Sequence, residues 1–315
     1  MLNDVYSRVT SRIIADLERG VRPWHQPWTP GSSSPSSRPL RSTGEPYRGI
    51  NVLLLWAEAQ ARRYTSPTWF TYKQAQALGA QVRRGETGSL VVYADRLTRR
   101  EQDDTGQEHE LSIPFMRTYN VFNVEQIDGL PERFSAPPTP PRSSATGLAH
   151  ADAFVRGTGA DIQHGGPHAC YIPSRDHIRL PAFDQFRDAE SYYATLAHEL
   201  IHWTGHPTRL ARTFGQQRWG DAAYALEELV AELGAAFVCA DLQLTPEPRP
   251  DHACYIDHWL RALRDDKRCL FSAAAHAQRA ADYLTSPPID GGVSESMDDV
   301  VKSRADTQCT AATQE

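Results

Sequence analysis

The residues best suited to chemistry lie in the short stretch 196–203, which reads LAHELIHW. Within it, His198, Glu199 and His202 form the HExxH pattern that zinc peptidases build on a single helix. Residues four apart lie on the same face of a helix, so both imidazoles can reach one ion. Glu199 lies one position round from the first histidine, where its carboxylate can take a proton from a water without binding the ion. The pattern predicts a metal-dependent hydrolase with Glu199 as general base.

A third metal ligand has to come from another segment. The helix that carries the two histidines should end soon after them, because Gly205 and Pro207 follow. A catalytic zinc usually has three protein ligands and one open position. The next strong helical segment, 224–240, contains glutamates in an otherwise apolar run, where a carboxylate is costly unless it is paired or bound to metal. We expect Glu228 to be the third ligand, and its competitors are Glu227, Glu232 and His206.

Other polar residues near these positions are candidates for supporting roles. Glu232 is expected to orient a ligand imidazole through its free N–H, the alternative being an ion pair with Arg209 or Arg212. His206 is expected on the substrate side or beside a ligand, the alternative being an interaction with the last helical carbonyls. A peptidase also needs a group that stabilises the developing oxyanion. Tyr224, His206 and Arg209 are candidates that the sequence does not rank.

Two sets of longer motifs resemble one known family. The run YYATLAHELIHWTGH at 192–206, followed by YALEELVAELGA at 224–235, resembles the metallopeptidase domain of the ArdC family of plasmid antirestriction proteins. The motifs GVRPWHQPW at 20–28, YRGIN at 47–51, WFTY at 69–72 and YNVFN at 119–123 resemble the single-stranded-DNA-binding domain of that family. The resemblance covers about residues 1–130 and 148–285.

This resemblance implies an α+β protein of two domains. The first would be an α+β domain that binds single-stranded DNA, and the second a zincin-like metallopeptidase of the gluzincin type, in which Glu228 completes the metal site and Glu232 bonds a ligand histidine. The implied metal is Zn²⁺, with Mn²⁺ or Co²⁺ as alternatives. The implied role is protection of incoming plasmid or mobile-element DNA from host restriction. The protein substrate stays unidentified, a DNA-bound or restriction-system protein being one candidate.

Arginines and aromatic residues interleave before residue 90. Residues 1–130 hold 16 Lys and Arg against 14 Asp and Glu, a balance of +2, whereas the whole chain carries −6. Net charge therefore gives no argument for DNA, but cations beside aromatic faces suit a sequence-tolerant single-strand binder. For any single aromatic residue, burial in the core is the competing interpretation. The expected nucleotide contacts are Arg22, Trp24, Tyr47, Arg48, Trp69, Tyr72 and Lys73.

Composition and turn signals divide the chain. Residues 131–147 are rich in Pro and Ser and predict a linker between a first domain at 1–130 and a second at 148–285, while 286–315 predict a disordered tail. No run approaches the roughly 20 apolar residues of a membrane helix, and no signal peptide is recognised. Five cysteines without a CxxC pair indicate reduced thiols. Together these features favour a cytoplasmic protein that does not act in a membrane.

Hydrophobic periodicity predicts the elements that must position these residues. In the first domain we expect helices at 2–19, 50–63 and 71–79 and strands at 89–97 and 113–124, joined by an acidic hairpin tip. In the second we expect helices at 148–158, 187–204, 221–241 and 252–283 on a small sheet. Residues 169–181 predict a hairpin whose edge strand could align an extended peptide.

Two classes of function remain open on this sequence. In the first, the protein is a metal-dependent peptidase that its DNA-binding domain brings to substrates on single strands. In the second, it protects DNA by binding it, and the zincin-like domain has no essential proteolytic role. Loss of function on replacement of Glu199 separates the two classes.

Overall fold

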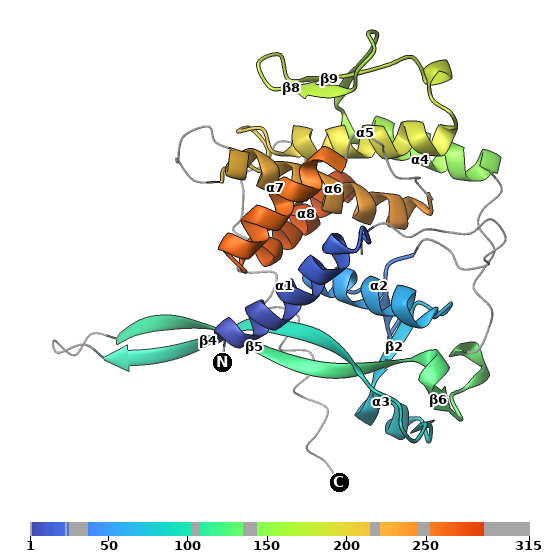
Figure 1. The fold of residues 1–315 in the computed structure, drawn as a ribbon, viewed down its shortest axis with the longest axis vertical. Helices are drawn as coiled ribbons and strands as arrows, with labels where there is room; N and C mark the ends of the chain where they lie inside the picture. The colour runs from blue at the N-terminus through green and yellow to red at the C-terminus, as the bar shows by residue number, and fades with distance from the viewer. Residues whose placement is uncertain are drawn as a thin grey trace. The chain divides into compact units, whose positions relative to one another are not determined.

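The computed structural model describes residues 2–22, 24, 37–102, 108–134, 144–214, 221–244 and 253–286. Residues 1–285 form one compact unit (Figure 1). Its first part contains α1 (Leu2–Glu18), β1 (Leu40–Arg41), α2 (Ile50–Arg62), β2 (Thr68–Thr71), α3 (Tyr72–Ala77), β3 (Gln81–Val82), β4 (Ser89–Gln102), β5 (Glu108–Asn123), η1 (Val124–Gln126), β6 (Ile127–Asp128) and η2 (Glu132–Phe134). Its second part contains α4 (Ser144–Thr158), β7 (Asp161–His164), β8 (Cys170–Ile172), β9 (His177–Leu180), η3 (Phe183–Gln185), α5 (Ala189–Thr204), α6 (Asp221–Leu242), α7 (Ala253–Asp265) and α8 (Cys269–Thr285).

The sheet of the first part is built around a long hairpin. Its strands lie in the order β1-β2-β5-β4, with β1 parallel to β2 and the other neighbours antiparallel. Helix α2 packs on β4, and Asn51 near its start holds the open edge of that strand. The Asn51 side chain donates to the carbonyl of Val92 at 2.7 Å and accepts from the Val92 amide at 2.7 Å. One amide side chain therefore bonds the edge of β4 as a neighbouring strand would.

The second part is a helical layer with a small sheet on one side. Strands β7, β9 and β8 form this sheet in that order, so β8 is an edge strand, and β8 and β9 make the predicted hairpin. Both strands contact α5, whose other sides contact α6 and α8 (Figure 1). The carrier helix of the HExxH motif thus lies between an edge strand and the core helices.

Most predicted elements are confirmed, and one expectation was wrong. The expected helix at 252–283 is two helices, because Asp266 ends the first and its carboxylate accepts the backbone amide of Arg268 at 2.9 Å, which starts a new turn. The linker expected at 131–147 stays a prediction, and within this stretch η2 covers Glu132–Phe134 and α4 begins at Ser144. Its proline-rich centre lies outside the described residues, as does the predicted tail after residue 286.

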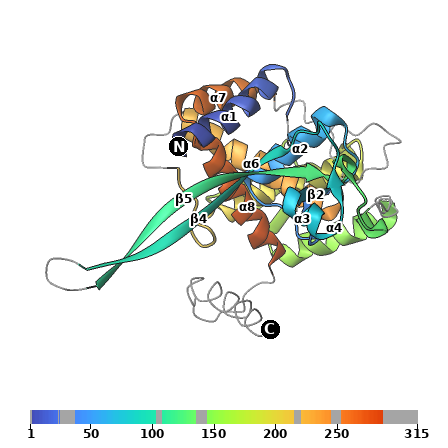
Figure 2. The same ribbon diagram turned by 90° about the horizontal axis from the view of Figure 1, so that it is seen from below.

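One hydrophobic core joins the two parts. Helix α1 packs against α7 (Figure 2), and the Trp24 ring lies 5.9 Å from that of Trp259 on α7. Arg38, 6% exposed, donates to Asp241 at 2.6 Å and to Gln278 at 2.9 Å on the helices of the second part. Burial of a large apolar side chain contributes about 1.5–3 kcal/mol, so these contacts hold the two parts together strongly. In the described residues, no helix combines the length and the apolar character needed to cross a membrane.

Candidate metal centre

Helix α5 carries the HExxH motif and is capped at both ends. Asp188 precedes it and accepts the amide of Ser191 at 2.7 Å, which satisfies one of the unpaired amides of the first turn. The helix ends at Thr204, as expected, and Gly205 follows with φ −73°. This glycine is thus not in the left-handed conformation. A Cβ at Gly205 would lie 2.9 Å from Nη2 of Arg212, so the position needs a small residue to admit that guanidinium.

Helix α6 approaches α5 closely enough to complete a site. At their contact, a Cβ on Gly234 would lie 2.7 Å from Cδ1 of Ile201, a distance that side chains do not tolerate. Gly234 therefore permits the close packing of the two helices. Ile201 is fully buried and lies next to the second histidine in the sequence. This packing brings the glutamates of α6 to the histidines of α5.

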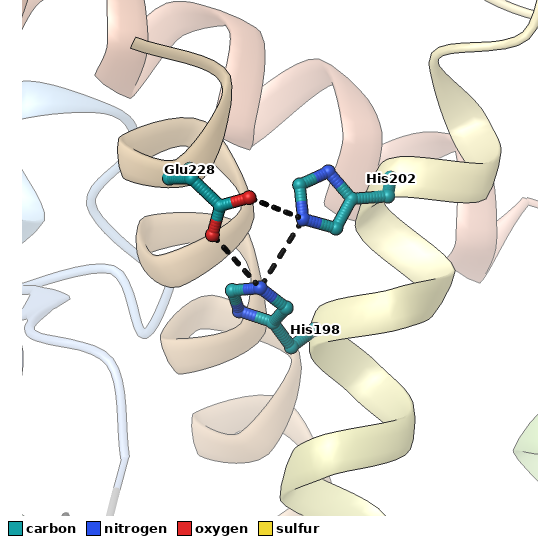
Figure 3. Close-up of side chains that lie close together, drawn as sticks. All are labelled: His198, His202 and Glu228. Atoms are coloured by element: carbon teal, nitrogen blue, oxygen red, sulfur yellow. Dashed lines mark hydrogen bonds and ion pairs between the residues drawn. The ribbon is translucent and has the colours of Figure 1, made fainter. Parts of the chain in front are cut away.

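Three side chains converge from the two helices (Figure 3). His198 Nε2 lies 3.2 Å from His202 Nε2, and the carboxylate oxygens of Glu228 lie 3.6 Å from the first and 3.5 Å from the second. One ligand atom from each residue lies within 4.8 Å of the other two. Two imidazole nitrogens and a carboxylate oxygen form a donor set that suits Zn²⁺ and other first-row cations. The residues present therefore fit a divalent metal ion, and Glu228 is the carboxylate that α6 contributes to this group.

The outward nitrogens of both histidines each face a different glutamate. His202 Nδ1 lies 3.1 Å from Glu227, and His198 Nδ1 lies 3.8 Å from Glu232. Such partners fix the tautomer and the ring orientation of ligand histidines. Glu227 is held in turn by Arg212, which donates from Nε at 2.8 Å and from Nη2 at 2.6 Å. The geometry thus favours an orienting role for both Glu227 and Glu232.

The carboxylates of this cluster remain ionised despite their burial. Burial alone would raise the pKa of Glu227, but hydrogen bonds from Arg212 and His202 lower it to about 2. Burial also opposes ionisation of Glu228, whose pKa is nevertheless lowered by His198, His202 and a hydrogen bond from Tyr224. Burial disfavours protonation of His202, yet the neighbouring carboxylates raise its pKa. The cluster is therefore an anionic environment suited to a cation.

Glu199 lies beside the three converging residues and is not one of them. It is 5% exposed, and its carboxylate accepts the backbone amide of Tyr171 at 2.8 Å. Tyr171 belongs to the edge strand β8. The carboxylate is thus fixed between α5 and the strand on which an extended peptide could align.

The structure separates the three candidates for oxyanion stabilisation. Tyr224 is 56% exposed and bonds Glu228, so its ring lies at the site. Arg209 is committed elsewhere, because it forms an ion pair with Asp176, donates to the carbonyl of Trp203 at 2.7 Å and lies over the Trp203 ring. His206 lies 2.8 Å from the hydroxyl of Thr208 in the following turn. Of the three, Tyr224 thus lies beside a candidate ligand, to which its hydroxyl donates.

The expected nucleotide contacts lie in different environments. Trp24, Tyr47 and Trp69 are 5%, 9% and 1% exposed, so a base could not stack on these rings in this conformation. Arg48 is exposed and forms an ion pair with Asp282 on α8. Tyr72, 41% exposed, and Lys73, also exposed, begin α3.

Arg22, another expected nucleotide contact, lies at the metal centre. Its Nη1 is 3.6 Å from Oε1 of Glu232, and its side chain is 14% exposed. Sequence reasoning missed this ion pair and also the pairing of Glu227 with His202. One signal was available for the pairing of Glu227 with His202. Each of the two candidate ligand histidines needs a partner for its outward nitrogen, and one further acid is needed as the third ligand. Glu227, Glu228 and Glu232 supply these three acids.

Two regions of the chain match known protein families. Residues 3–122 match the family described as the N-terminal domain of anti-restriction factor ArdC. Residues 149–276 match the zincin-like metallopeptidase family. Both regions mix helices and strands, as expected for an α+β protein.

Similar proteins come from plasmids and bacteria. The crystal structures of antirestriction ArdC from plasmid R388 superimpose with TM-scores of 0.75 (metal-free, 46% identical) and 0.71 (Mn(II)-bound, 45% identical), each covering 89% of this chain and 96% of that one. The uncharacterized protein y4eC of Sinorhizobium fredii (strain NBRC 101917 / NGR234) is 44% identical over 91% of this chain and 93% of its own. The DNA primase TraC of Escherichia coli is 38% identical over 89% of this chain, which spans only 27% of that protein.

Proposed function

The chain belongs to the ArdC family of antirestriction proteins, and on this basis we propose that it is a metal-dependent peptidase that acts on proteins associated with single-stranded DNA. The observation that carries the proposal is the convergence of His198, His202 and Glu228 with Glu199 fixed beside them. A merely structural metal site needs no buried acid next to the ligands. An acid in this position is what proton transfer during hydrolysis requires.

Each residue of the site has a defined part in the proposed reaction. A divalent cation held by the three ligands would supply Lewis-acid chemistry, polarising the scissile carbonyl and lowering the pKa of a water. Glu199 takes the proton from the attacking water and passes it to the leaving amine. Edge strand β8 aligns an extended peptide through its main-chain groups. Tyr224 donates to the oxygen on which negative charge develops.

We propose Zn²⁺ as the native metal, because two imidazoles and one carboxylate form a common catalytic zinc set. Mn²⁺ and Co²⁺ are the alternatives, and a relative from plasmid R388 has been crystallised with Mn(II). Metal content of the protein purified without added metal, measured by plasma mass spectrometry, distinguishes among the three.

The first part of the chain would bring this site to its substrates. We propose that it binds single-stranded DNA and that the protein protects incoming DNA from restriction in the cytoplasm. The match to the N-terminal domain of ArdC supports this role, and so does the likeness to TraC, a DNA primase. Cys170, Cys239 and Cys269 are free thiols, which suits a reducing compartment. The substrate would be a protein bound to the DNA or part of the restriction system.

The test is Glu199→Gln, with Glu190→Gln as control because Glu190 is exposed on the same helix. We expect Glu199→Gln to lose about 10²–10⁴-fold in cleavage of labelled casein, assayed with and without oligothymidylate, while it retains its metal. Glu190→Gln should cleave normally. Cleavage by Glu199→Gln at the normal rate would overturn the peptidase assignment. Full protection of a transferred plasmid by a cleavage-dead Glu199→Gln would show instead that binding alone accounts for antirestriction.

A further inference from the structure

An exposed aromatic and cationic cluster lies on one face of the β4–β5 hairpin. Tyr93 pairs directly with Arg117 across the strands, Val91 with Tyr119 and Asp95 with Phe115. Directly opposed residues, and residues two apart on one strand, share a face of the sheet. The side chains of Tyr93, Phe115, Arg117 and Tyr119 therefore point the same way. We call these four residues the hairpin platform.

The rings of the hairpin platform form a continuous row. The Tyr93 ring lies 6.1 Å from that of Phe115 and 6.3 Å from that of Tyr119. Arg117 places its Cζ 5.3 Å from the centre of the Phe115 ring. Tyr93 also donates a hydrogen bond to Asp95 at 2.6 Å, which orients its ring. The platform thus combines three aromatic rings with a guanidinium group.

The platform begins where the hairpin leaves the core. Val91 and Val121 occupy the same face and are 7% and 1% exposed, because they pack on the core. Two positions farther out, Tyr93 and Tyr119 are 48% and 46% exposed. Figures 1 and 2 both show the hairpin continuing past α1 and α2. The same strand face is therefore apolar where it is covered and aromatic where it faces solvent.

We propose that the hairpin platform is the surface on which the bases of single-stranded DNA stack. This inference rests on the proposed DNA-binding function and names its surface. Bases of every kind stack on aromatic rings, and an arginine among the rings can pair with a phosphate or stack on a base. Cross-strand aromatic pairs also stabilise a hairpin, but that contribution is only about 0.2–1 kcal/mol per pair. Stacking gains about 1–3 kcal/mol per base, so exposed rings at this spacing can contribute more free energy to DNA binding than to the stability of the hairpin.

Placement and the guanidinium of Arg117 favour a nucleic acid over an apolar protein partner, and the carboxylate of Asp95, which shares this face, accepts the hydroxyl of Tyr93. The guanidinium of Arg117 lies within the platform, where a purely apolar partner would have to desolvate it without compensation. The platform also lies in residues 3–122, which match the N-terminal domain of ArdC. Tyr72, the exposed aromatic residue expected from the sequence, packs on Phe122 at 6.4 Å. Phe122 is three positions from Tyr119 and hence on the other face of β5, so Tyr72 is not part of the platform.

The test compares ring removal on the platform with ring removal elsewhere. Binding of a fluorescein-labelled oligothymidylate to the full-length protein is followed by anisotropy. We expect Tyr93→Ala/Tyr119→Ala to weaken binding at least about tenfold, because two stacking contacts are lost. Tyr93→Phe/Tyr119→Phe keeps both rings and should bind within about twofold of the natural protein. The matched control is Tyr283→Ala, which removes a tyrosine on α8 that is 39% exposed and should leave binding unchanged.

Two measurements distinguish failure of the platform from misfolding of a variant and from absence of DNA binding. If the natural protein does not bind the oligonucleotide, the DNA-binding function fails and the inference with it. If the natural protein binds and the double alanine variant binds equally well, only the platform is refuted. Where the double alanine variant has a lower melting temperature, photocrosslinking of the natural protein to a bromodeoxyuridine oligonucleotide decides. Crosslinks in the tryptic peptides 85–96, 101–117 or 118–133, which carry the platform residues, support the platform, and crosslinks confined to other peptides overturn it.

Discussion

Arg22, in the region that matches the N-terminal domain of ArdC, lies 3.6 Å from Glu232, and the other carboxylate oxygen of Glu232 lies 3.8 Å from Nδ1 of the candidate metal ligand His198. The two parts of the chain therefore meet at the metal centre through one ion pair. An arginine of the first part thus pairs with the acid that faces a candidate ligand of the second.

We expect Arg22→Gln to weaken metal binding about 10-fold, the lower end of the range for outer partners of ligand histidines. Glu232→Gln should have a similar effect, and the double variant should be no worse than either, because both act through the same imidazole. Competition with a chromogenic chelator measures the affinities. Arg19→Gln is the control, since Arg19 is 64% exposed and pairs only with Asp16 among the ion pairs of the described residues. Fully additive losses would contradict the coupling.

The identity of the third ligand can be tested by metal content. Loss of an outer partner of a ligand lowers metal affinity about 10–100-fold. Glu228→Ala should lower the affinity by more than this, whereas Glu232→Ala should lower it within this range. Glu228 lies 3.5–3.6 Å from both Nε2 atoms, while Glu232 approaches only the far side of His198. Inductively coupled plasma mass spectrometry after dialysis gives the metal-to-protein ratio. Loss of metal from Glu232→Ala alone would overturn the assignment of Glu228.

Gly234 should tolerate no side chain. A Cβ there would meet Ile201 at 2.7 Å, so Gly234→Ala should lower the free energy of unfolding by about 1–3 kcal/mol, despite the higher helix propensity of alanine. Urea denaturation measures the change. Gly157→Ala is the control, because no atom lies within 4 Å of that Cβ, and it should be neutral or stabilising. If Gly234→Ala is as stable as the natural protein, α5 and α6 do not depend on this close approach.

His276 should make stability depend on pH. Burial, together with the positive charges of Arg279 and Arg212, lowers its pKa from 6.5 to about 4. The folded state therefore prefers the neutral ring, and its contribution is fully present above pH 6.5 and is lost as the pH falls towards 4. Between pH 7 and pH 5 we expect His276→Gln to lose about 0.5–1 kcal/mol less stability than the natural protein, a value reduced for partial exposure of the ring. Thermal melts at the two pH values test this, and parallel losses in both proteins would contradict it.

The sequence predicted the helices well because their signals are local. The HExxH helix, its end at Thr204 and the hairpin before it all follow from periodicity and turn residues. The break at Asp266 was missed, although the five charged residues 264–268 interrupt the apolar pattern there, and a side-chain cap on the Arg268 amide starts the next helix. Local pattern cannot show such a cap without knowledge of the backbone.

The convergence of the candidate ligands was predictable from the sequence, and their surroundings were less so. The spacing of His198 and His202 fixes their common face, but the partner of each outward nitrogen depends on how α6 rotates against α5. Which aromatic rings are exposed was also not predictable, since Trp69, in an arginine-rich segment, is buried in the core. The alternation of Phe115, Arg117 and Tyr119 on one strand was a period-two signal that could have identified the hairpin platform.

The contact between Trp24 and Trp259 bears on whether the two parts of the gene can be separated by recombination. A recombination event that cut the gene between its two halves would leave a large indole face in water on each fragment, and neither product would be well packed. Such genes are therefore expected to move as one indivisible cassette. The alignment with TraC agrees with this expectation, because 89% of this chain aligns with a region that makes up 27% of that longer protein.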